Sequence, residues 1–203
     1  MNTNQVYNKL PASYYLNEDV LFLAKDLIGK KLVTNFNNNL TSGMIVETEA
    51  YRSINDKASH AYLNKKTKKN EMMYSNGGVS YVYMCYGIHS LFNIVTNRQN
   101  IADAILIRAI EPVDGIETMK ERSSKKNIFN IGSGPGKLSM ALGINMNSNG
   151  EKLTGHKIWI QDTKSIQSHQ ILSGKRIGVD YAGKDSDLPW RFYIKDNKHI
   201  SKK

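Results

Sequence analysis

Short runs of β-branched and aromatic residues recur along this chain and constrain its fold more than any other feature. Each run is bounded by Gly, Asn or Asp, which favour turns and end strands. The runs predict strands at Lys31–Asn35, Met44–Tyr51, Val79–Tyr86, Leu91–Asn97, Ala104–Ile110, Lys157–Gln161 and Arg191–Ile194. Because several of these runs follow one another at hairpin spacing, we expect an antiparallel sheet.

Helical patterns are fewer than strand patterns. Apolar residues recur at helical spacing from Val20 to Ile28, after acidic residues that suit a helix start and before a possible stop at Gly29. A second helix is predicted from Pro112 to about Lys120, and a third after Gly134-Pro135, because proline fits the first helical turn. The length of 203 residues suits one core. We therefore expect a single α+β domain over residues 1–203.

The chain is strongly basic. Its 28 Lys and Arg residues against 18 Asp and Glu residues leave a net charge of +10. Such a charge attracts polyanions such as nucleic acid, although it can equally serve solubility alone. A single cysteine, Cys85, allows no intramolecular disulfide and indicates a reducing, cytoplasmic setting. We expect no signal peptide, no membrane-spanning segment and no metal site, since the required apolar lengths and ligand spacings are missing.

The run Met44–Tyr51 combines acids with an otherwise apolar strand. Side chains alternate along a strand, so Glu47, Glu49 and Tyr51 are predicted to share one face. A carboxylate held there can act as a general base on water, which a hydrolase requires. The alternative is that the glutamates pair with surface lysines, and the residues alone favour that alternative. They do not choose between Glu47 and Glu49.

A second run, from Tyr81 to Gly87, is rich in tyrosine. Tyr81 and Tyr83 share a strand face, and Tyr86-Gly87 falls where the chain turns back. An aromatic side chain exposed on a hairpin tip can enter the minor groove and fill the gap left by an extruded base. The alternative is packing in the core, which we favour for Tyr81, whereas we favour intercalation for Tyr86. Cys85 is expected on the opposite face as a small apolar residue.

Two further segments invite a functional interpretation. His60 precedes a lysine-rich loop that could contact phosphates or could be a solvated loop. The segment 132–137 resembles a phosphate-binding loop but fails that pattern at Ile131 and Leu138. Its Gly-rich turn still opens a helix whose amides can hold a phosphate. There is no nucleotide-cofactor motif.

Together these segments resemble the alkyladenine (3-methyladenine) DNA glycosylase family over nearly the whole chain. The matching segments are VETEAY at 46–51, His60, YVYMCYG at 81–87, LIRAIEP at 106–112, SGPGKL at 133–138, RIGVDYAG at 176–183 and RFY at 191–193. The resemblance implies a compact α+β domain around a curved antiparallel sheet, with flanking helices and a protruding β-hairpin that inserts into DNA. It implies no metal and no organic cofactor.

The resemblance also implies residue roles. It makes Glu49 the general base, with Arg108 and the backbone carbonyl of Val179 positioning the attacking water. The flipped purine would be held by Tyr51, His60 and Tyr83, and guarded by Asn93, which would clash with the exocyclic amine of guanine. The DNA duplex would be contacted by the intercalating Tyr86, by Met73 and by the loop from Lys65 to Lys69.

The implied function is base-excision repair of double-stranded DNA by a monomer with no obligate protein partner. The enzyme would flip alkylated or deaminated purines, such as 3-methyladenine, 7-methylguanine, hypoxanthine and ethenoadenine, and hydrolyse the N-glycosidic bond. With no lysine nucleophile in the motifs, we expect no strand cleavage. Two departures are Glu71, where relatives often carry arginine, and Ile88-His89. Alternatives are a non-catalytic nucleic-acid-binding module and a subdomain like that of methionyl-tRNA formyltransferases.

Overall fold

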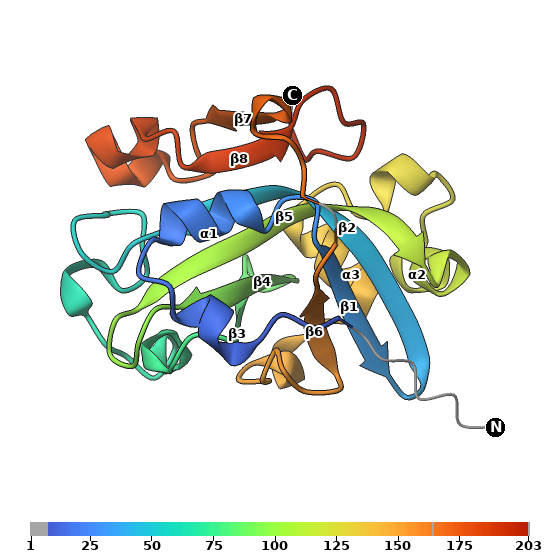
Figure 1. The fold of residues 1–203 in the computed structure, drawn as a ribbon, viewed down its shortest axis with the longest axis horizontal. Coiled ribbons are helices and arrows are strands. Elements are labelled where there is room, and N and C mark those ends of the chain that lie inside the picture. Colours follow the sequence, from blue (N-terminus) through green and yellow to red (C-terminus); the bar gives the residue numbers. More distant parts are fainter. Residues whose placement is uncertain (1–7, 164, 203) are drawn as a thin grey trace.

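Eight strands form one antiparallel sheet in the computed structural model, which describes residues 8–163 and 165–202 (Figure 1). Six strands follow the order β3-β4-β5-β2-β1-β6, while β8 pairs with both β2 and β7. The strands are β1 Lys31–Phe36, β2 Asn39–Tyr51, β3 Ser80–Cys85, β4 His89–Thr96, β5 Asp103–Asp114, β6 Ile158–Gln161, β7 Ile171–Gly174 and β8 Arg191–Ile194. The predicted α+β class and antiparallel sheet are confirmed.

Strand β2 organises the sheet because both of its edges are used along most of its length. Its first half forms a hairpin with β1 through Asn37 and Asn38, whose φ angles of 53° and 63° match the tight turn that twisted hairpins prefer. Its second half pairs with β8, and its other edge pairs with β5. Register shifts on both sides of Glu47 bend the strand at the point where β8 joins it.

The alternation of side chains divides the sheet into two faces. Ile105 and Ile107 of β5, with Phe92 and Ile94 of β4, enter the main apolar core together with residues of helix α1 (Val20–Asp26). Thr48 fixes that helix to β2, since its hydroxyl donates to the carbonyl of Ala24 at 2.8 Å. Burial of each large aliphatic side chain contributes about 1.5–3 kcal/mol. The neighbouring residues along the same strands therefore project to the opposite face.

Helices α1 and α3 begin at the residues that the sequence predicts. The side chain of Asp19 caps α1 by accepting from the N–H groups of Leu21 and Phe22, both at 3.0 Å. Pro135 opens α3 after Gly134. The α-helices are α1 Val20–Asp26, α2 Ile116–Ser123 and α3 Pro135–Leu142; short 3-10 helices are η1 Ala12–Leu16, η2 Tyr62–Asn64, η3 Glu71–Tyr74, η4 Ile128–Asn130, η5 Met146–Ser148, η6 Ser168–Gln170 and η7 Asp180–Asp187.

The helix predicted from Pro112 is present but begins four residues later, so its predicted start is wrong. Strand β5 continues through Pro112 to Asp114, and α2 begins at Ile116 after Gly115, which takes a φ of 70°. Pro112 lies opposite Gly43 beside a register shift, where a residue without an N–H group is tolerated in a sheet. The strand β7 was also not anticipated, because its four residues show no alternation of apolar and polar types.

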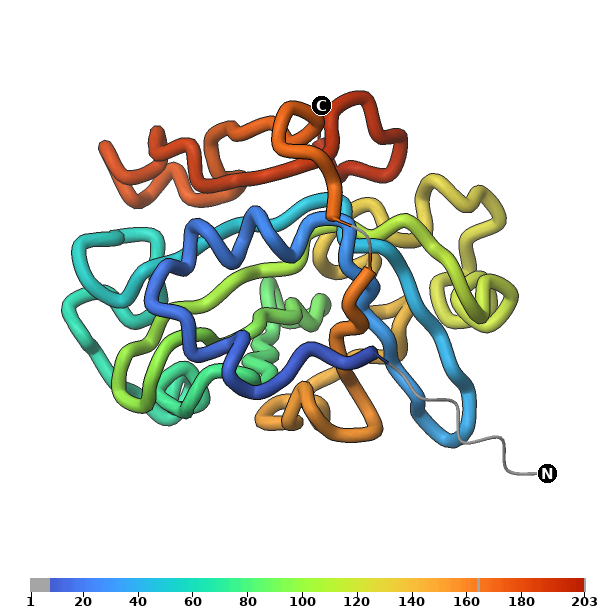
Figure 2. The backbone as a smooth tube through the Cα atoms, in the orientation of Figure 1, coloured from blue at the N-terminus to red at the C-terminus, as the bar shows by residue number. Residues whose placement is uncertain are grey.

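The C-terminal part of the chain lies along one side of the molecule. Figure 2 shows the β7–β8 pair there, followed by a loop after which the chain returns toward β8. Across the described residues, no helix has both the length and the apolar character that crossing a bilayer requires.

Candidate active site

Cross-strand registers bring the predicted site residues into one row across the sheet. Glu49 of β2 lies opposite Leu106 of β5, Leu106 lies opposite Asn93 of β4, and Asn93 lies opposite Tyr81 of β3. Residues directly opposite one another project to the same face. The adjacent rows add Tyr51 and Tyr83, and Arg108 of β5 lines the same cavity. Residues of four strands therefore converge on the face that α1 leaves uncovered.

A cavity of about 210 Å³ opens on this face. Its volume lies below the roughly 300–1,000 Å³ of typical small-molecule pockets, so it suits a group such as a single base. No lysine lines it in the described part of the chain, nor does that part contain three metal-ligating side chains placed to hold an ion. The lining includes Tyr51, Ala58, His60, Met73, Tyr81, Tyr83, Cys85, Tyr86, Leu91, Asn93, Leu106, Arg108, Pro135, Ile177, Gly178, Val179 and Tyr181.

Glu49 lies beneath the cavity and is fully buried. One carboxylate oxygen accepts from the N–H of Ile177 at 2.7 Å, and the other accepts from the Tyr51 hydroxyl at 2.8 Å and from Arg108 Nη1 at 3.1 Å. Burial raises the pKa of Glu49, and the Arg108 guanidinium opposes that rise. The group is thus held in one orientation and is more basic than an ordinary glutamate.

Glu47 is also fully buried but has different surroundings. One of its oxygens accepts from Arg108 Nε at 3.3 Å, Arg191 Nη1 at 3.0 Å and the Ser201 hydroxyl at 2.8 Å. The other accepts from the Ser201 N–H at 2.5 Å. Both glutamates reach Arg108, which confirms that they share a face. Their partners are buried arginines rather than the surface lysines of the alternative interpretation.

The aromatic wall of the cavity is built by His60, Tyr81 and Tyr83. The His60 ring packs edge-to-face on Tyr83 with centroids 4.6 Å apart, and its Nδ1 lies 2.9 Å from the Tyr81 hydroxyl. Burial lowers the pKa of His60 and raises the pKa of Tyr81, so His60 is neutral and Tyr81 is protonated near pH 7. Tyr81 is 2% exposed, as expected for core packing. We assign Tyr81 as donor to Nδ1, which leaves Nε2–H to donate.

Tyr51 is fixed from behind by Arg176, a residue for which the local pattern predicted no role. The Arg176 guanidinium lies 4.8 Å from the centre of the Tyr51 ring. It also forms a two-pronged pair with Asp56 at 2.6 and 2.7 Å, and both side chains are fully buried. The next residue, Ile177, supplies the N–H bound to Glu49. The RIGVDYAG match contained both residues, but only the folded chain shows what they contact.

Residues 179–181 form the remaining side of the cavity. Val179 is 4% exposed, and its carbonyl already accepts from the N–H of Ala182 at 2.9 Å. A carbonyl oxygen has two lone pairs, so it can accept one more hydrogen bond. Tyr181 is 70% exposed, and its hydroxyl donates to the carbonyl of Ala58 at 3.1 Å. Tyr181 is a lining residue that the sequence analysis did not single out.

The β3–β4 hairpin ends in an exposed apolar turn. Tyr86 is 89% exposed with a φ of 51°, and Ile88 is 71% exposed. Met84, just before the turn, is 45% exposed. Apolar side chains gathered on a protruding turn indicate a surface that meets a partner. The predicted exposure of Tyr86 at the hairpin tip is confirmed.

The lysine-rich loop is exposed from Lys65 to Lys69. Lys68 and Lys69 line a groove of about 650 Å³ that runs past His60 and Tyr83 to Tyr86, whereas Lys65 lies outside it. Asn70 ties the loop to the cavity, since its amide donates to the carbonyls of His60 and Lys65, both at 2.8 Å. The loop is therefore held beside the cavity mouth.

The Met73 side chain is 2% exposed and forms part of the cavity wall, so a contact of this residue with DNA would be made by its backbone and stays a prediction. One sequence-based expectation requires correction. Cys85 was expected to face away from the tyrosines, but it lines the same cavity. Residues 81, 83 and 85 are each two positions apart on the strand, so their side chains project to the same face.

Comparison with known proteins agrees with this geometry. The sequence profile of the family described as methylpurine-DNA glycosylase (MPG) matches residues 14–198. A protein from Chlamydia felis is 48% identical over 195 residues, covering 94% of this chain and 100% of its own. Proteins from Alkaliphilus oremlandii and Clostridium perfringens are 45% and 44% identical, covering 96% and 93% of this chain and 100% and 97% of their own. All three are provisionally named 3-methyladenine DNA glycosylase. The chain therefore belongs to the methylpurine-DNA glycosylase family and is a DNA-repair enzyme that hydrolyses N-glycosidic bonds.

Proposed function

We propose that the enzyme flips alkylated and deaminated purines out of duplex DNA and hydrolyses their N-glycosidic bonds, leaving an abasic site and an uncut strand. The substrates are 3-methyladenine, 7-methylguanine, hypoxanthine and ethenoadenine. The observation that carries the proposal is a fully buried carboxylate, Glu49, beneath an aromatic cavity sized for one base. The absence of lysine from the described lining supports hydrolysis without strand cleavage.

In the proposed reaction, Glu49 removes a proton from water as the water oxygen attacks C1′ of the flipped nucleotide. The C1′–N bond breaks, and its electron pair leaves with the base. Arg108 and the free lone pair of the Val179 carbonyl orient the water. A cationic base such as 7-methylguanine leaves without further protonation, whereas neutral hypoxanthine requires a proton. The raised pKa of Glu49 makes it an effective base for this step.

The base itself would be held between Tyr51 on one side and His60 and Tyr83 on the other. Stacking on aromatic side chains contributes about 1–3 kcal/mol per base in comparable contacts. Asn93 donates from its amide nitrogen to the backbone carbonyls of Tyr81 and Leu91, which fixes its orientation in the cavity wall. A rigid Asn93 would exclude the exocyclic amine of normal guanine. Lys65, Lys68 and Lys69 would contact phosphates beside the cavity.

Base release by the wild-type enzyme tests the proposal. Duplexes carrying each of the four lesions, and an undamaged duplex, are incubated with excess enzyme, and the free base and the intact strand are measured. We expect release from the lesions and strand breakage only after alkali treatment of the abasic product. Breakage without alkali would contradict the hydrolytic assignment, and release from none of the lesions would contradict the proposed substrates.

We also propose that the enzyme acts as a monomer without an obligate protein partner, since a single copy of the chain forms a cavity, a buried carboxylate and an exposed hairpin tip. Light scattering after size-exclusion chromatography, with and without lesion DNA, measures the mass directly. A dimer would contradict this part of the proposal.

Tyr81→Phe tests the orientation of His60. The variant keeps the ring but removes the hydroxyl that bonds to Nδ1, so the hydrogen on Nε2 is no longer fixed. We expect single-turnover release to fall roughly 2- to 12-fold, the equivalent of about 0.5–1.5 kcal/mol for one hydrogen bond. Tyr74→Phe is the matched control, because the buried Tyr74 hydroxyl has no hydrogen-bond partner among the described residues. Equal rates for the two variants would refute the assignment.

Tyr86→Ala tests intercalation by the hairpin. Because the side chain is 89% exposed, its loss should leave the thermal unfolding midpoint unchanged. Binding to lesion duplexes should weaken roughly 5- to 150-fold, the equivalent of about 1–3 kcal/mol of stacking. Fluorescence anisotropy measures the Kd, and Phe22→Ala, which removes a 52% exposed aromatic on α1, is the control. A Kd matching that control would argue against intercalation by Tyr86.

A further inference from the structure

Four buried charged side chains meet beneath the cavity. Glu47 and Glu49 are inaccessible, and the side chains of Arg108 and Arg191 are 8% and 10% exposed. Arg108 lies between the two carboxylates and donates to Glu47 from Nε and to Glu49 from Nη1. One guanidinium thus serves both glutamates, and the strength of its contact with Glu49 depends on how fully Glu47 is satisfied by other donors.

The C-terminal segment supplies those other donors. Ser201 donates to Glu47 twice, from its N–H at 2.5 Å and from its hydroxyl at 2.8 Å. The same hydroxyl oxygen accepts from Arg108 Nη2 at 3.3 Å, so each nitrogen of that guanidinium has an acceptor. Arg191 adds a bond from Nη1 to the carbonyl of Lys202 at 3.1 Å. Figure 2 shows the chain returning toward β8 to reach this position.

We infer that Ser201 is a positioning residue for base release, which holds Arg108 against Glu49. Its two hydrogen bonds satisfy Glu47 without drawing Arg108 away, and its hydroxyl fixes the third corner of the guanidinium. The inference rests on the proposed role of Glu49. It assigns a catalytic purpose to the end of the chain, about 150 residues from the glutamates in sequence.

The charged groups around Glu49 set its pKa, so a change in their positions should alter the pH dependence of base release. Arg108 of β5 and the N–H of Ile177 lower the pKa of Glu49, as does the Tyr51 hydroxyl, while burial and Glu47 of β2 raise it. The other charged or titratable groups near it are Arg176, Tyr83 and Tyr181. Weakening the contact with Arg108 should therefore shift the acidic limb of activity to higher pH. Removing the charge of Glu47 should shift it to lower pH.

The test compares Ser201→Ala with Ser201→Thr in single-turnover release of 7-methylguanine, a lesion that needs no protonation to leave. Ser201→Ala removes the two hydrogen bonds of the hydroxyl, to Glu47 and from Arg108, and keeps the N–H bond to Glu47. It should lower the maximal rate roughly 3- to 10-fold and shift the acidic limb of the pH–rate profile to higher pH. The Kd for lesion DNA and the thermal unfolding midpoint should change little. Ser201→Thr, which keeps the hydroxyl, should restore both rate and pH limb. Glu47→Gln should shift the limb in the opposite direction.

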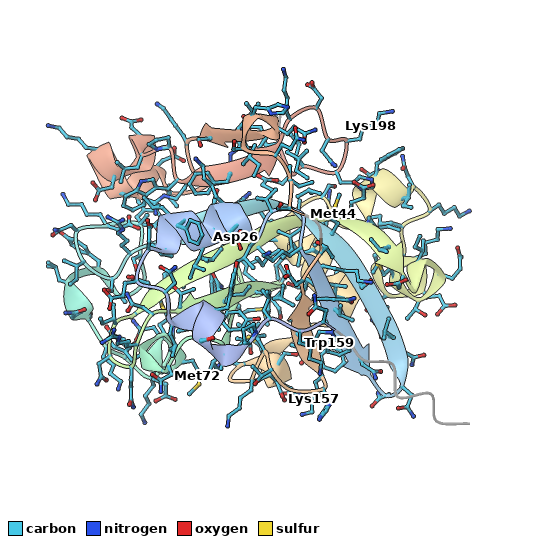
Figure 3. The ribbon with its side chains drawn as sticks, in the orientation of Figure 1. Asp26, Met44, Met72, Lys157, Trp159 and Lys198 are labelled. Carbon is cyan, nitrogen blue, oxygen red and sulfur yellow. The ribbon has the colours of Figure 1, made fainter. Side chains whose placement is uncertain are left out.

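Lys198→Ala is the control on the same segment, since Lys198 is exposed (Figure 3) and its amine packs on the Phe129 ring instead of the buried charges. It should leave the rate and the pH limb unchanged. A Ser201→Ala enzyme with wild-type rate and pH limb would overturn the inference, as would equal defects in Ser201→Ala and Ser201→Thr. If Glu47→Gln does not fold, the comparison of Ser201→Ala with Ser201→Thr still tests the inference. Failure of the wild type to release any base would instead contradict the proposed function.

Discussion

Glu49→Gln is expected to abolish base release while leaving the binding of lesion-containing DNA intact. The amide has the size of the carboxylate, and its single oxygen can still accept from Arg108 and Tyr51, so the fold should persist although the bond from the Ile177 N–H is lost. It cannot take a proton from water. Loss of a general base typically costs about 10²- to 10⁴-fold in rate. Single-turnover release from a 7-methylguanine duplex measures the loss, and anisotropy measures binding.

The control for this experiment is Glu111→Gln, which changes a partly exposed glutamate at the far end of β5 and should keep the wild-type rate. Full activity of Glu49→Gln would show that the base lies elsewhere and would direct attention to Glu47. The wild-type pH profile gives a second check. Because burial raises the pKa of Glu49, activity should be lost on acidification at a higher pH than the roughly 4.3 of an ordinary glutamate.

Arg176→Met is expected to cause the largest loss of stability. The substitution leaves Asp56 buried without its charged partner and removes the cation that packs on Tyr51. Breaking a buried pair in this way costs about 3–5 kcal/mol. In a chain of this size each kcal/mol lowers the Tm by about 2–4 °C. Thermal unfolding followed by circular dichroism should therefore show a Tm lower by roughly 6–20 °C.

Two further variants separate the stability cost of an unpaired buried charge from the cost of losing any salt bridge. Arg176→Met combined with Asp56→Asn removes the uncompensated charge and should recover much of the lost stability. Lys175→Met breaks the neighbouring pair with Asp187, whose side chains are 70% and 67% exposed, and should cost less than about 1 kcal/mol. Equal losses from Lys175→Met and Arg176→Met would contradict the explanation.

Local sequence was sufficient to predict the sheet and the face that bears the site. Alternation along each strand placed Glu49 with Tyr51 and Tyr81 with Tyr83, because side chains two residues apart must project to the same side. The aromatic hairpin tip at Tyr86 also follows from the local pattern, because Tyr86-Gly87 falls between two strand-forming runs. The faces of the strands and the position of the turn both depend on residues that are close together in the chain.

Other features depended on contacts between distant segments. Glu47 and Glu49 have the same local pattern, and they differ because Ser201 and Arg191 bind one carboxylate while Ile177 and Tyr51 bind the other. Pro112 extends a strand because Gly43 lies opposite it, a pairing that its own neighbours do not reveal.

The sequence by itself determined the α+β class, the strand faces and, through its ordered motifs, the family resemblance. The tertiary structure alone decided that Met73 lies inside the cavity, that Arg176 fixes Tyr51, and that the C-terminal segment closes the charge cluster. The physical reason is that burial and electrostatic environment are properties of the assembled fold. They are set by groups more than 100 residues apart, such as Arg176 and Asp56, which no local periodicity relates.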